Sequence, residues 1–262
     1  MGKRRIKATA NVTPEPAIEA TAERINLGAL LSEKKQPMQP FLLWLIGDTP
    51  LICHAWSQKG KLEMLKKQAG ATVSGKEKRD PEQDFLDSLY EMDEATYGFP
   101  ITAVKKAILA CAHKDRGVPR SDVMQALWLD AEMVKTRPAL AGAICDMPLV
   151  RIYGSAPQMR EDMVRIGAGI RRTANLAYRA QFTTWALRVT GAFNPLVLQS
   201  HQLLFLARSS GTGIGIGDWR NEKGGWAGAY HIADLEEQAE WEKFRAGKGS
   251  LPQPVSASEA AA

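Results

Sequence analysis

The segment GTGIGIGDWRNEKGGWAGAY, residues 211–230, lies between a predicted helix and a predicted strand; we refer to it as the glycine segment. Leucines recur at helical spacing over residues 198–208, just before it, and residues 228–232 have strand character. A dinucleotide-binding fingerprint would follow a strand and open a helix, so these regularly spaced glycines do not form a Rossmann loop. The Gly-Lys-Ser/Thr end of a P-loop is also missing, which excludes that nucleotide-binding class.

The glycine segment combines bare backbone with cationic and aromatic side chains. Exposed amides, cations and stacking rings suit the backbone and the bases of a nucleic acid. The candidate nucleic-acid-binding residues of this segment are Trp219, Arg220, Lys223 and Trp226. The same residues also allow a second interpretation, a glycine-rich hairpin whose tryptophans are packed in the core.

Strand and helix signals on the N-terminal side of the glycine segment predict an α+β domain. Strand, helix, strand, strand, helix and strand follow one another, which is the split βαβ order of a ferredoxin or RRM-like core. We expect this core over residues 37–233, with a basic helical insertion at about 57–100 and a C-terminal glycine-rich loop. The predicted elements before the loop are strands at 41–46, 51–56 and 149–153, a hairpin of strands at 176–181 and 184–192, and helices at 57–67, 80–92, 101–111 and 198–208.

Both ends of the chain differ in composition from this core. Residues 1–36 are polar, begin with a run of basic residues and contain Pro14 and Pro16, so we predict a basic N-terminal arm. Residues 234–262 predict an acidic helix to about residue 244, followed by a disordered tail.

Positive charge is concentrated in two windows of this 262-residue chain of net charge +5. Residues 57–80 contain seven bases against three acids, and residues 151–188 contain seven arginines, no lysine and two acids. Arginine without lysine favours forked contacts to phosphate and stacking on bases, although a solvated, salt-bridged surface explains the charge equally well. The candidate nucleic-acid-binding residues of these windows are Arg160, Arg165, Arg171, Arg172, Arg179, Lys59, Lys61, Lys66 and Lys67.

Tyr178 and Arg179 alternate on a predicted strand and therefore face opposite sides of it. Either Tyr178 is a core residue and Arg179 faces outward, or the reverse holds. An RRM-like sheet could present either side chain to single-stranded bases.

Composition excludes several classes of protein. The apolar run at residues 41–46 is far shorter than the roughly 20 residues of a membrane span, and the basic start has no apolar stretch behind it. Cys53, Cys111 and Cys145 are scattered and odd in number, which favours reduced thiols and a cytoplasmic location. We therefore expect no membrane partner.

Metal and catalytic signals are weak in this sequence. The cysteines and histidines lack the paired spacing of zinc ligands, and His54 is the histidine best placed for a polar site. The adjacent Glu161 and Asp162 could hold magnesium for phosphodiester cleavage, but such a pair more often neutralises neighbouring arginines. Asp48 and Asp218 are isolated loop acids. We predict no metal site, no cofactor and no catalytic residue.

Three segments together resemble the RAMP superfamily, the RRM-like proteins that form CRISPR effector backbones. They are the glycine segment, LIGDTPLI at residues 45–52 and the proline-led helix start GFPITAVKKAI at residues 98–108. The order of elements is similar over residues 38–233, and the basic insertion lies where those proteins carry a thumb. The whole chain also resembles proteins encoded by phages and prophages, which implies a bacterial host cell.

These observations predict a protein that coats single-stranded RNA or DNA through its phosphate backbone, as a head-to-tail homo-oligomer or filament. The basic arm and the acidic helix would supply complementary ends for such an assembly. Two alternatives remain open. One is a RAMP-type or metal-dependent endoribonuclease, and the other is a phage structural or assembly protein.

Overall fold

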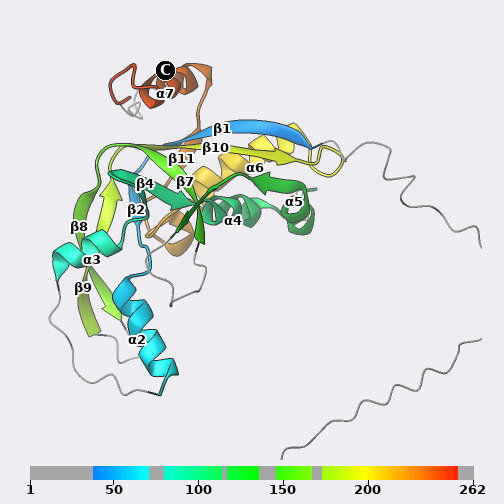
Figure 1. Cartoon of the computed structure of the whole chain (residues 1–262). Helices are drawn as coiled ribbons and strands as arrows, with labels where there is room; N and C mark the ends of the chain where they lie inside the picture. The colour runs from blue at the N-terminus through cyan, green and yellow to red at the C-terminus, as the bar shows by residue number, and fades with distance from the viewer. Residues whose placement is uncertain (1–37, 71–79, 114–116, 136–145, 167–172, 253–262) are drawn as a thin grey trace, which may run out of the picture. The chain divides into compact units, whose positions relative to one another are not determined.

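The computed structural model describes residues 38–70, 80–113, 117–135, 146–166 and 173–252, which all belong to the unit from Pro37 to Ala262. They form helices and antiparallel sheets (Figure 1), in agreement with the predicted α+β class. The arm expected over residues 1–36 lies outside the described residues, as do residues 253–262 of the tail expected after the acidic helix. The helices are α2 (Gln58–Gln68), α3 (Pro81–Asp87), α4 (Ile101–Cys111), α5 (Arg120–Ala126), α6 (Ser200–Gly213) and α7 (Leu235–Arg245). The strands are β1 (Gln39–Gly47), β2 (Leu51–Cys53), β3 (Glu91–Asp93), β4 (Thr96–Pro100), β5 (Leu127–Leu129), β6 (Glu132–Lys135), β7 (Asp146–Gly154), β8 (Gln158–Ile166), β9 (Thr173–Phe182), β10 (Trp185–Phe193) and β11 (Tyr230–Ile232).

The strands form two sheets. The larger sheet has eight strands in the order β11–β1–β10–β7–β4–β3, with β5 paired to β10 and β6 paired to β7. The smaller sheet has three strands in the order β2–β9–β8. All strand pairs are antiparallel.

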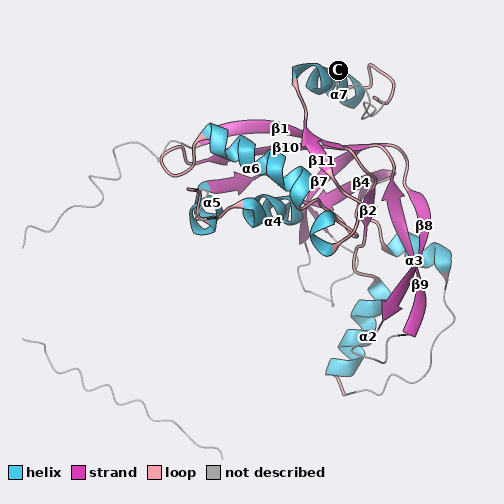
Figure 2. Ribbon diagram, turned by 180° about the vertical axis from the view of Figure 1, so that it is seen from behind, coloured by secondary structure: helices cyan, strands magenta, loops and turns pink. Residues whose placement is uncertain are grey.

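Helices cover both faces of the larger sheet. Helices α4 and α6 lie on one face, and α7 lies on the other (Figures 1 and 2). Side chains that alternate along β10 connect to both sides, because successive residues of a strand point to opposite faces. Leu187 and Val189 belong to the main hydrophobic core, whereas Ala186 belongs to a second, small core with Trp241 of α7.

Local sequence signals explain where several helices begin. The Ser57 hydroxyl accepts a hydrogen bond from the Gly60 amide at the start of α2, which is the capping bond that serine favours at this position. Asp80 caps α3 in the same way, with Pro81 at the first helical position. Asp234 begins α7 with a complete capping box, in which its partner is Glu237.

The insertion at residues 57–100 differs from the expected helical insertion. The helix predicted over 80–92 ends at Asp87, because the chain then turns into β3 and β4. Strand β4 pairs with β7, so this part of the insertion extends the larger sheet. The buried hydroxyl of Ser88 donates to the Phe85 carbonyl oxygen at 2.6 Å and accepts from the Ala180 amide at 2.8 Å, which ties the end of α3 to β9.

The predicted hairpin of residues 176–181 and 184–192 is wrong. Strands β9 and β10 exist and follow one another closely, but β9 pairs with β2 and β8, whereas β10 pairs with β1, β5 and β7. The chain passes from one sheet to the other between Phe182 and Trp185. The true hairpin is formed by β8 and β9. Residues 213–217 of the glycine segment contain no strand.

None of the helices in the described part of the chain has both the length and the apolar character needed to cross a bilayer.

Candidate functional site

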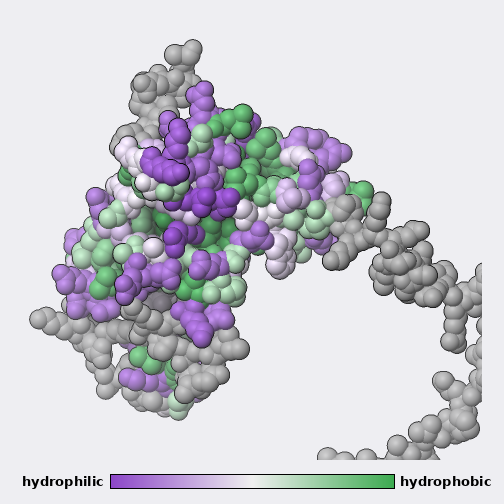
Figure 3. All heavy atoms as spheres, turned by 45° about the horizontal axis from the view of Figure 1, so that its top comes forward, coloured by the Kyte–Doolittle hydropathy of each residue, from purple (hydrophilic) through white to green (hydrophobic). Residues whose placement is uncertain are grey.

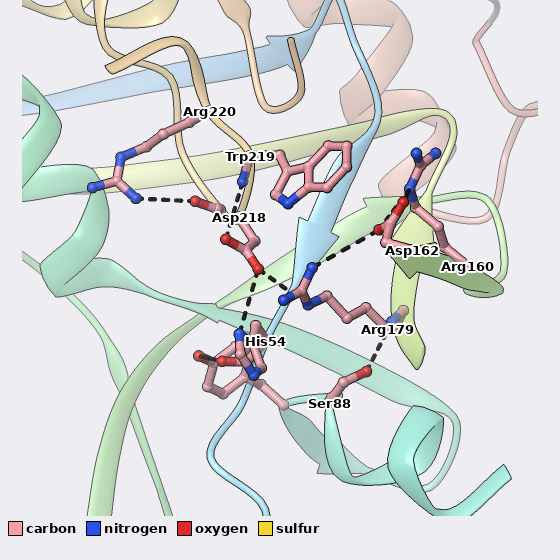
Figure 4. A network of polar contacts seen from close by, with 11 residues as sticks. His54, Ser88, Arg160, Asp162, Arg179, Asp218, Trp219 and Arg220 are labelled. Carbon is pink, nitrogen blue, oxygen red and sulfur yellow. Dashed lines mark hydrogen bonds and ion pairs between the residues drawn. The ribbon is translucent and has the colours of Figure 1, made fainter. Parts of the chain in front are cut away.

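A buried guanidinium lies between two carboxylates at the junction of the smaller sheet and the glycine segment (Figure 4). Arg179 of β9 places Nε 3.1 Å from Oδ2 of Asp218 and Nη1 3.8 Å from Oδ2 of Asp162. The side chain of Arg179 is 10% exposed and that of Asp162 is 4% exposed. Arg179 thus neutralises two acids that come from different elements. We call His54, Arg160, Asp162, Arg179 and Asp218 the Arg179 cluster.

Arg160 links this cluster to two tryptophans. It is the register partner of Arg179 on β8, and its Nε donates to both oxygens of Asp162 at 2.9 and 3.0 Å. Its Cζ lies 5.6 Å from the centroid of the Trp219 ring and 5.4 Å from that of the Trp226 ring. These distances are typical of cation–π contacts, so one fixed guanidinium orients both rings of the glycine segment.

Close backbone approaches determine the path of the glycine segment. The Asp218 amide donates to the Ile52 carbonyl oxygen of β2 at 2.9 Å, and the Trp219 amide donates to the Asp218 carboxylate at 3.1 Å. A Cβ atom at Gly228 would lie 1.7 Å from the Ile216 carbonyl oxygen, and φ there is +68°. Only glycine fits both conditions, which explains why the sequence needs it at this position.

His54 is the exposed end of the Arg179 cluster. Its Nδ1 lies 3.4 Å from Oδ2 of Asp218, and its side chain is 60% exposed. The polar contact with His54 is the main cause that holds the pKa of Asp218 below its usual value; partial burial opposes it, and the charge of Arg179 acts in the same direction as His54. Asp218 is therefore an ionised acceptor at neutral pH.

A cavity of about 540 Å³ opens beside His54 and Asp218. It is lined by residues of α4 from Ala103 to Ala110 and by residues 214–218 of the glycine segment. The charged side chains that line it are Lys106, Arg120, Arg220, Asp218 and Glu222, together with His54. Cations therefore outnumber acids along the cavity, and glycine backbone allows a ligand to come close.

Some buried polar atoms in the Arg179 cluster lack a hydrogen-bond partner. They are Nε and Nη1 of Arg179 and Oδ2 of Asp218. The contact between Nε and Oδ2 is an ion pair and does not count as a hydrogen bond. Buried polar groups are rarely left in this state, and a site that binds a further polar group is one reason for it.

The structure brings together only some of the predicted site residues. Arg160, Arg179, Trp219 and Trp226 meet in or against the Arg179 cluster. Arg179 is buried and Tyr178 half-buried, so the outward orientation of Arg179 that the sequence allowed is not observed. The burial of Arg179 does not support a direct phosphate contact.

Arg220 and Lys223 lie on the glycine segment near the cavity. The guanidinium of Arg220 donates to Glu222 at 2.6 and 2.9 Å and to the Gly217 carbonyl oxygen at 3.2 Å. Lys223 is exposed.

The remaining predicted residues lie elsewhere. Arg165 is exposed on β8, while Lys61, Lys66 and Lys67 lie on α2. Lys59 belongs to α2 but its side chain is not described, and Arg171 and Arg172 lie outside the described residues.

The contact between His54 and Asp218 was not predicted, nor was the part that Lys106 and Arg120 play in the cavity. His54 was singled out only as a polar-site histidine and Asp218 as an isolated acid. No linear pattern connects positions 54 and 218, because the backbone hydrogen bond from Asp218 to Ile52 of β2 that brings the two segments together is a tertiary contact.

The adjacent acids Glu161 and Asp162 point to opposite sides of β8. Glu161 is exposed, whereas the buried Asp162 is bound by Arg160 and Arg179. Among the described residues no group of three or more histidines, cysteines or acids could hold a metal ion. Asp162 therefore acts as a structural counter-ion.

No protein-family model matches the chain, and no curated protein matches it either.

Proposed function

We propose that this protein binds single-stranded nucleic acid at the Arg160–Trp219–Trp226 platform and along the cationic cavity beside it. The observation that carries the proposal is the guanidinium of Arg160, fixed by Asp162 and held against two tryptophan rings, one of which is about half exposed. Aromatic rings stack on bases of any sequence, and arginine adds both charge and a stacking plane.

The charges around the platform support a ligand with a phosphate backbone. Asp162 and Asp218 are compensated by buried or half-buried arginines, and Glu222 is paired with Arg220. Exposed Lys106, Arg120 and Lys223 remain on the surface next to the glycine segment. Such a surface attracts phosphates at a distance and orients them at contact.

A ferredoxin or RRM-like core is part of the proposal. In the order β11–β1–β10–β7, strand β10 lies between β1 and β7, and β1 lies between β10 and β11. Helix α4 falls between β1 and β7 in the chain, and α6 falls between β10 and β11. Two interleaved βαβ units of this kind support the RAMP-like interpretation.

Head-to-tail assembly on the strand is also proposed. A heterologous contact needs two different surfaces on one molecule. The cross-strand pair Met163 and Leu176 is exposed on the smaller sheet, and Trp128 and Leu196 are exposed at the end of β10 in the larger sheet. Light scattering with oligonucleotides of increasing length measures the assembly. We expect the bound mass to rise by whole protomers, and a constant 1:1 complex would contradict this part.

The test of binding is fluorescence anisotropy with a labelled 20-nucleotide single strand, as DNA and as RNA, at several salt concentrations. Arg160→Ala removes the charge and releases both rings, so we expect binding about 10-fold weaker and a shallower salt dependence. Arg151→Ala is the control, because Arg151 is a half-exposed arginine paired with Asp93 on another strand. Equal affinity of the two variants, or no binding by the wild type at low salt, would overturn the proposal.

A further inference from the structure

The face of the larger sheet that α7 covers carries aromatic rings beside a cation. Trp44 of β1 and Arg188 of β10 are register partners. In the next row of the same face, Ala186 of β10 pairs with Tyr153 of β7, and the Tyr153 ring lies 5.4 Å from the Trp44 ring. We call Trp44, Tyr153 and Arg188 the α7 face. Rings and a guanidinium at this spacing can hold a base and a phosphate.

Helix α7 covers the α7 face with two neighbouring side chains, an aromatic ring that contacts Trp44 and a carboxylate that pairs with Arg188. Trp241 stacks on Trp44 with ring centroids 6.1 Å apart and an interplanar angle of 30°. The next residue, Glu242, accepts hydrogen bonds from Nε of Arg188 at 2.9 Å and from Nε1 of Trp44 at 3.2 Å. A flat ring lies where a base would stack, and an anion lies where a phosphate would pair.

The attachment of α7 is limited. Trp241 is the only residue of α7 that is buried, and the core beneath it contains just three more buried residues, Trp44, Ile46 and Ala186. Phe244 of α7 packs partly buried against the same core, and Glu242 accepts from Trp44. The remaining contacts of α7 include two part-exposed ion pairs, Glu242 with Arg188 and Glu237 with His231. Hydrophilic residues predominate on the side turned toward the viewer in Figure 3. Partly exposed ion pairs contribute little each, so the cost of detaching α7 is mainly the exposure of Trp241 and Trp44, and a base stacked on Trp44 would replace part of that contact.

We propose that the α7 face is a second binding surface for single-stranded nucleic acid, and that α7 is an internal competitor that imitates one nucleotide. A strand displaces α7, places a base on Trp44 and pairs a phosphate with Arg188. The inference takes the class of ligand from the proposed function, but it assigns the binding of that ligand to a different surface. Occupation of the platform by a strand raises the local concentration of its neighbouring nucleotides at this protein, which favours the exchange.

The first test is Glu242→Gln in the full chain, with the same single strands. Loss of the carboxylate weakens the competitor, so we expect about fivefold tighter binding, and Trp44→Ala added to Glu242→Gln should abolish this gain. Glu240→Gln is the matched control, because Glu240 is an exposed glutamate of the same helix and its substitution changes net charge equally. Equal affinities of Glu242→Gln and Glu240→Gln would overturn the inference.

Hydrogen exchange of residues 235–245 gives a second readout that does not depend on any variant. Added single strand should accelerate exchange in α7, whereas unchanged or slower exchange would contradict displacement. Acceleration by a poly-glutamate peptide but not by the oligonucleotide would make the partner an acidic protein and would also overturn the inference. If the wild type binds and Arg160→Ala weakens the binding, while hydrogen exchange in α7 is unchanged, only the proposal of a second binding surface is contradicted. If no form of the protein binds, the proposed function fails with it.

Discussion

Two clusters of charged side chains in this protein differ in how completely their hydrogen bonds are made. Around α7, His231 is held by Asp48 at 2.6 Å and by Glu237 at 3.0 Å; we call these three residues the His231 cluster. In the Arg179 cluster the central contacts are 3.1 and 3.8 Å long, and buried atoms of Arg179 and Asp218 have no hydrogen-bond partner.

The difference distinguishes a structural contact, which holds α7, from a candidate binding site. The His231 cluster satisfies both nitrogens of its histidine and attaches α7 to the turn after β1. In the Arg179 cluster the charges are neutralised, but buried atoms of Arg179 and Asp218 have no hydrogen-bond partner. This cluster lies beside a cavity and two tryptophans that contact Arg160. Buried polar atoms are rarely left without a hydrogen-bond partner, so the Arg179 cluster differs from an ordinary structural contact, in which pairing is complete.

The largest effect should follow from the removal of the buried cation. Arg179→Met leaves Asp162 and Asp218 facing an apolar side chain, and loss of one partner of a buried ion pair costs about 3–5 kcal/mol. Denaturant-induced unfolding measures this loss. Arg151→Met, at a part-exposed pair, should cost less than about 1 kcal/mol. Similar costs for both variants would show that Arg179 behaves as a surface residue.

A smaller loss of stability should follow from adding a methyl group at Gly228, where the glycine segment bends. Gly228→Ala combines a positive φ with a contact that a Cβ atom cannot make, so we expect a loss of about 2–4 kcal/mol and a changed environment of Trp219. Gly213→Ala is the control, because a Cβ atom there meets nothing within 4 Å. Unfolding curves and tryptophan fluorescence would distinguish the two. Equal behaviour would contradict the close packing of this segment.

The smallest effect concerns pH, and it acts on the His231 cluster. Hydrogen bonding to Asp48 is the main cause that raises the pKa of His231 from 6.5 to about 9. The protonated form is therefore favoured in the folded protein, and its stabilisation is complete below about pH 6.5 and lost as the pH rises through about 9. Because the side chain is 37% exposed, we expect a contribution of no more than about 1 kcal/mol.

The measurement compares unfolding of the wild type and His231→Gln at pH 6 and pH 9.5. The variant is needed because burial also raises the pKa of Cys53 to about 12, so the unfolded chain loses that proton first and stability falls in alkali for a second reason. The wild type should lose more stability than the variant between these two pH values. Parallel losses would mean that His231 is not clamped as described.

Asp218 predicts the opposite response in the Arg179 cluster. Its pKa is lowered, chiefly by the polar contact with His54, so its stabilising contribution is present at neutral pH and is lost as the pH falls through the lowered value. Acid unfolding of Asp218→Asn should therefore be less steep than that of the wild type. An identical acid transition would show that Asp218 is not specifically stabilised as an anion.

Features that depend on neighbouring residues could be predicted from the sequence. Ser57 and Asp80 begin helices because a cap bonds to amides two or three positions away. Leu187 and Val189 lie together on the main core side of β10, because a strand has a period of two and alternate residues share one face. The run of arginines after residue 150 likewise marked Arg160 as a candidate.

Features that depend on distant partners were decided only by the tertiary structure. Strand character does not specify a partner, so β9 and β10 looked like a hairpin although they belong to separate sheets. Asp162 and Asp218 meet at Arg179 because β8 pairs with β9 and the glycine segment bonds to β2. The sequence alone determined which residues could bind an anion or stack. Packing decided that Arg179 pairs with the buried Asp162 and the partly buried Asp218, while Arg160 contacts two tryptophans, because burial and pairing are set by neighbours that are remote in the chain.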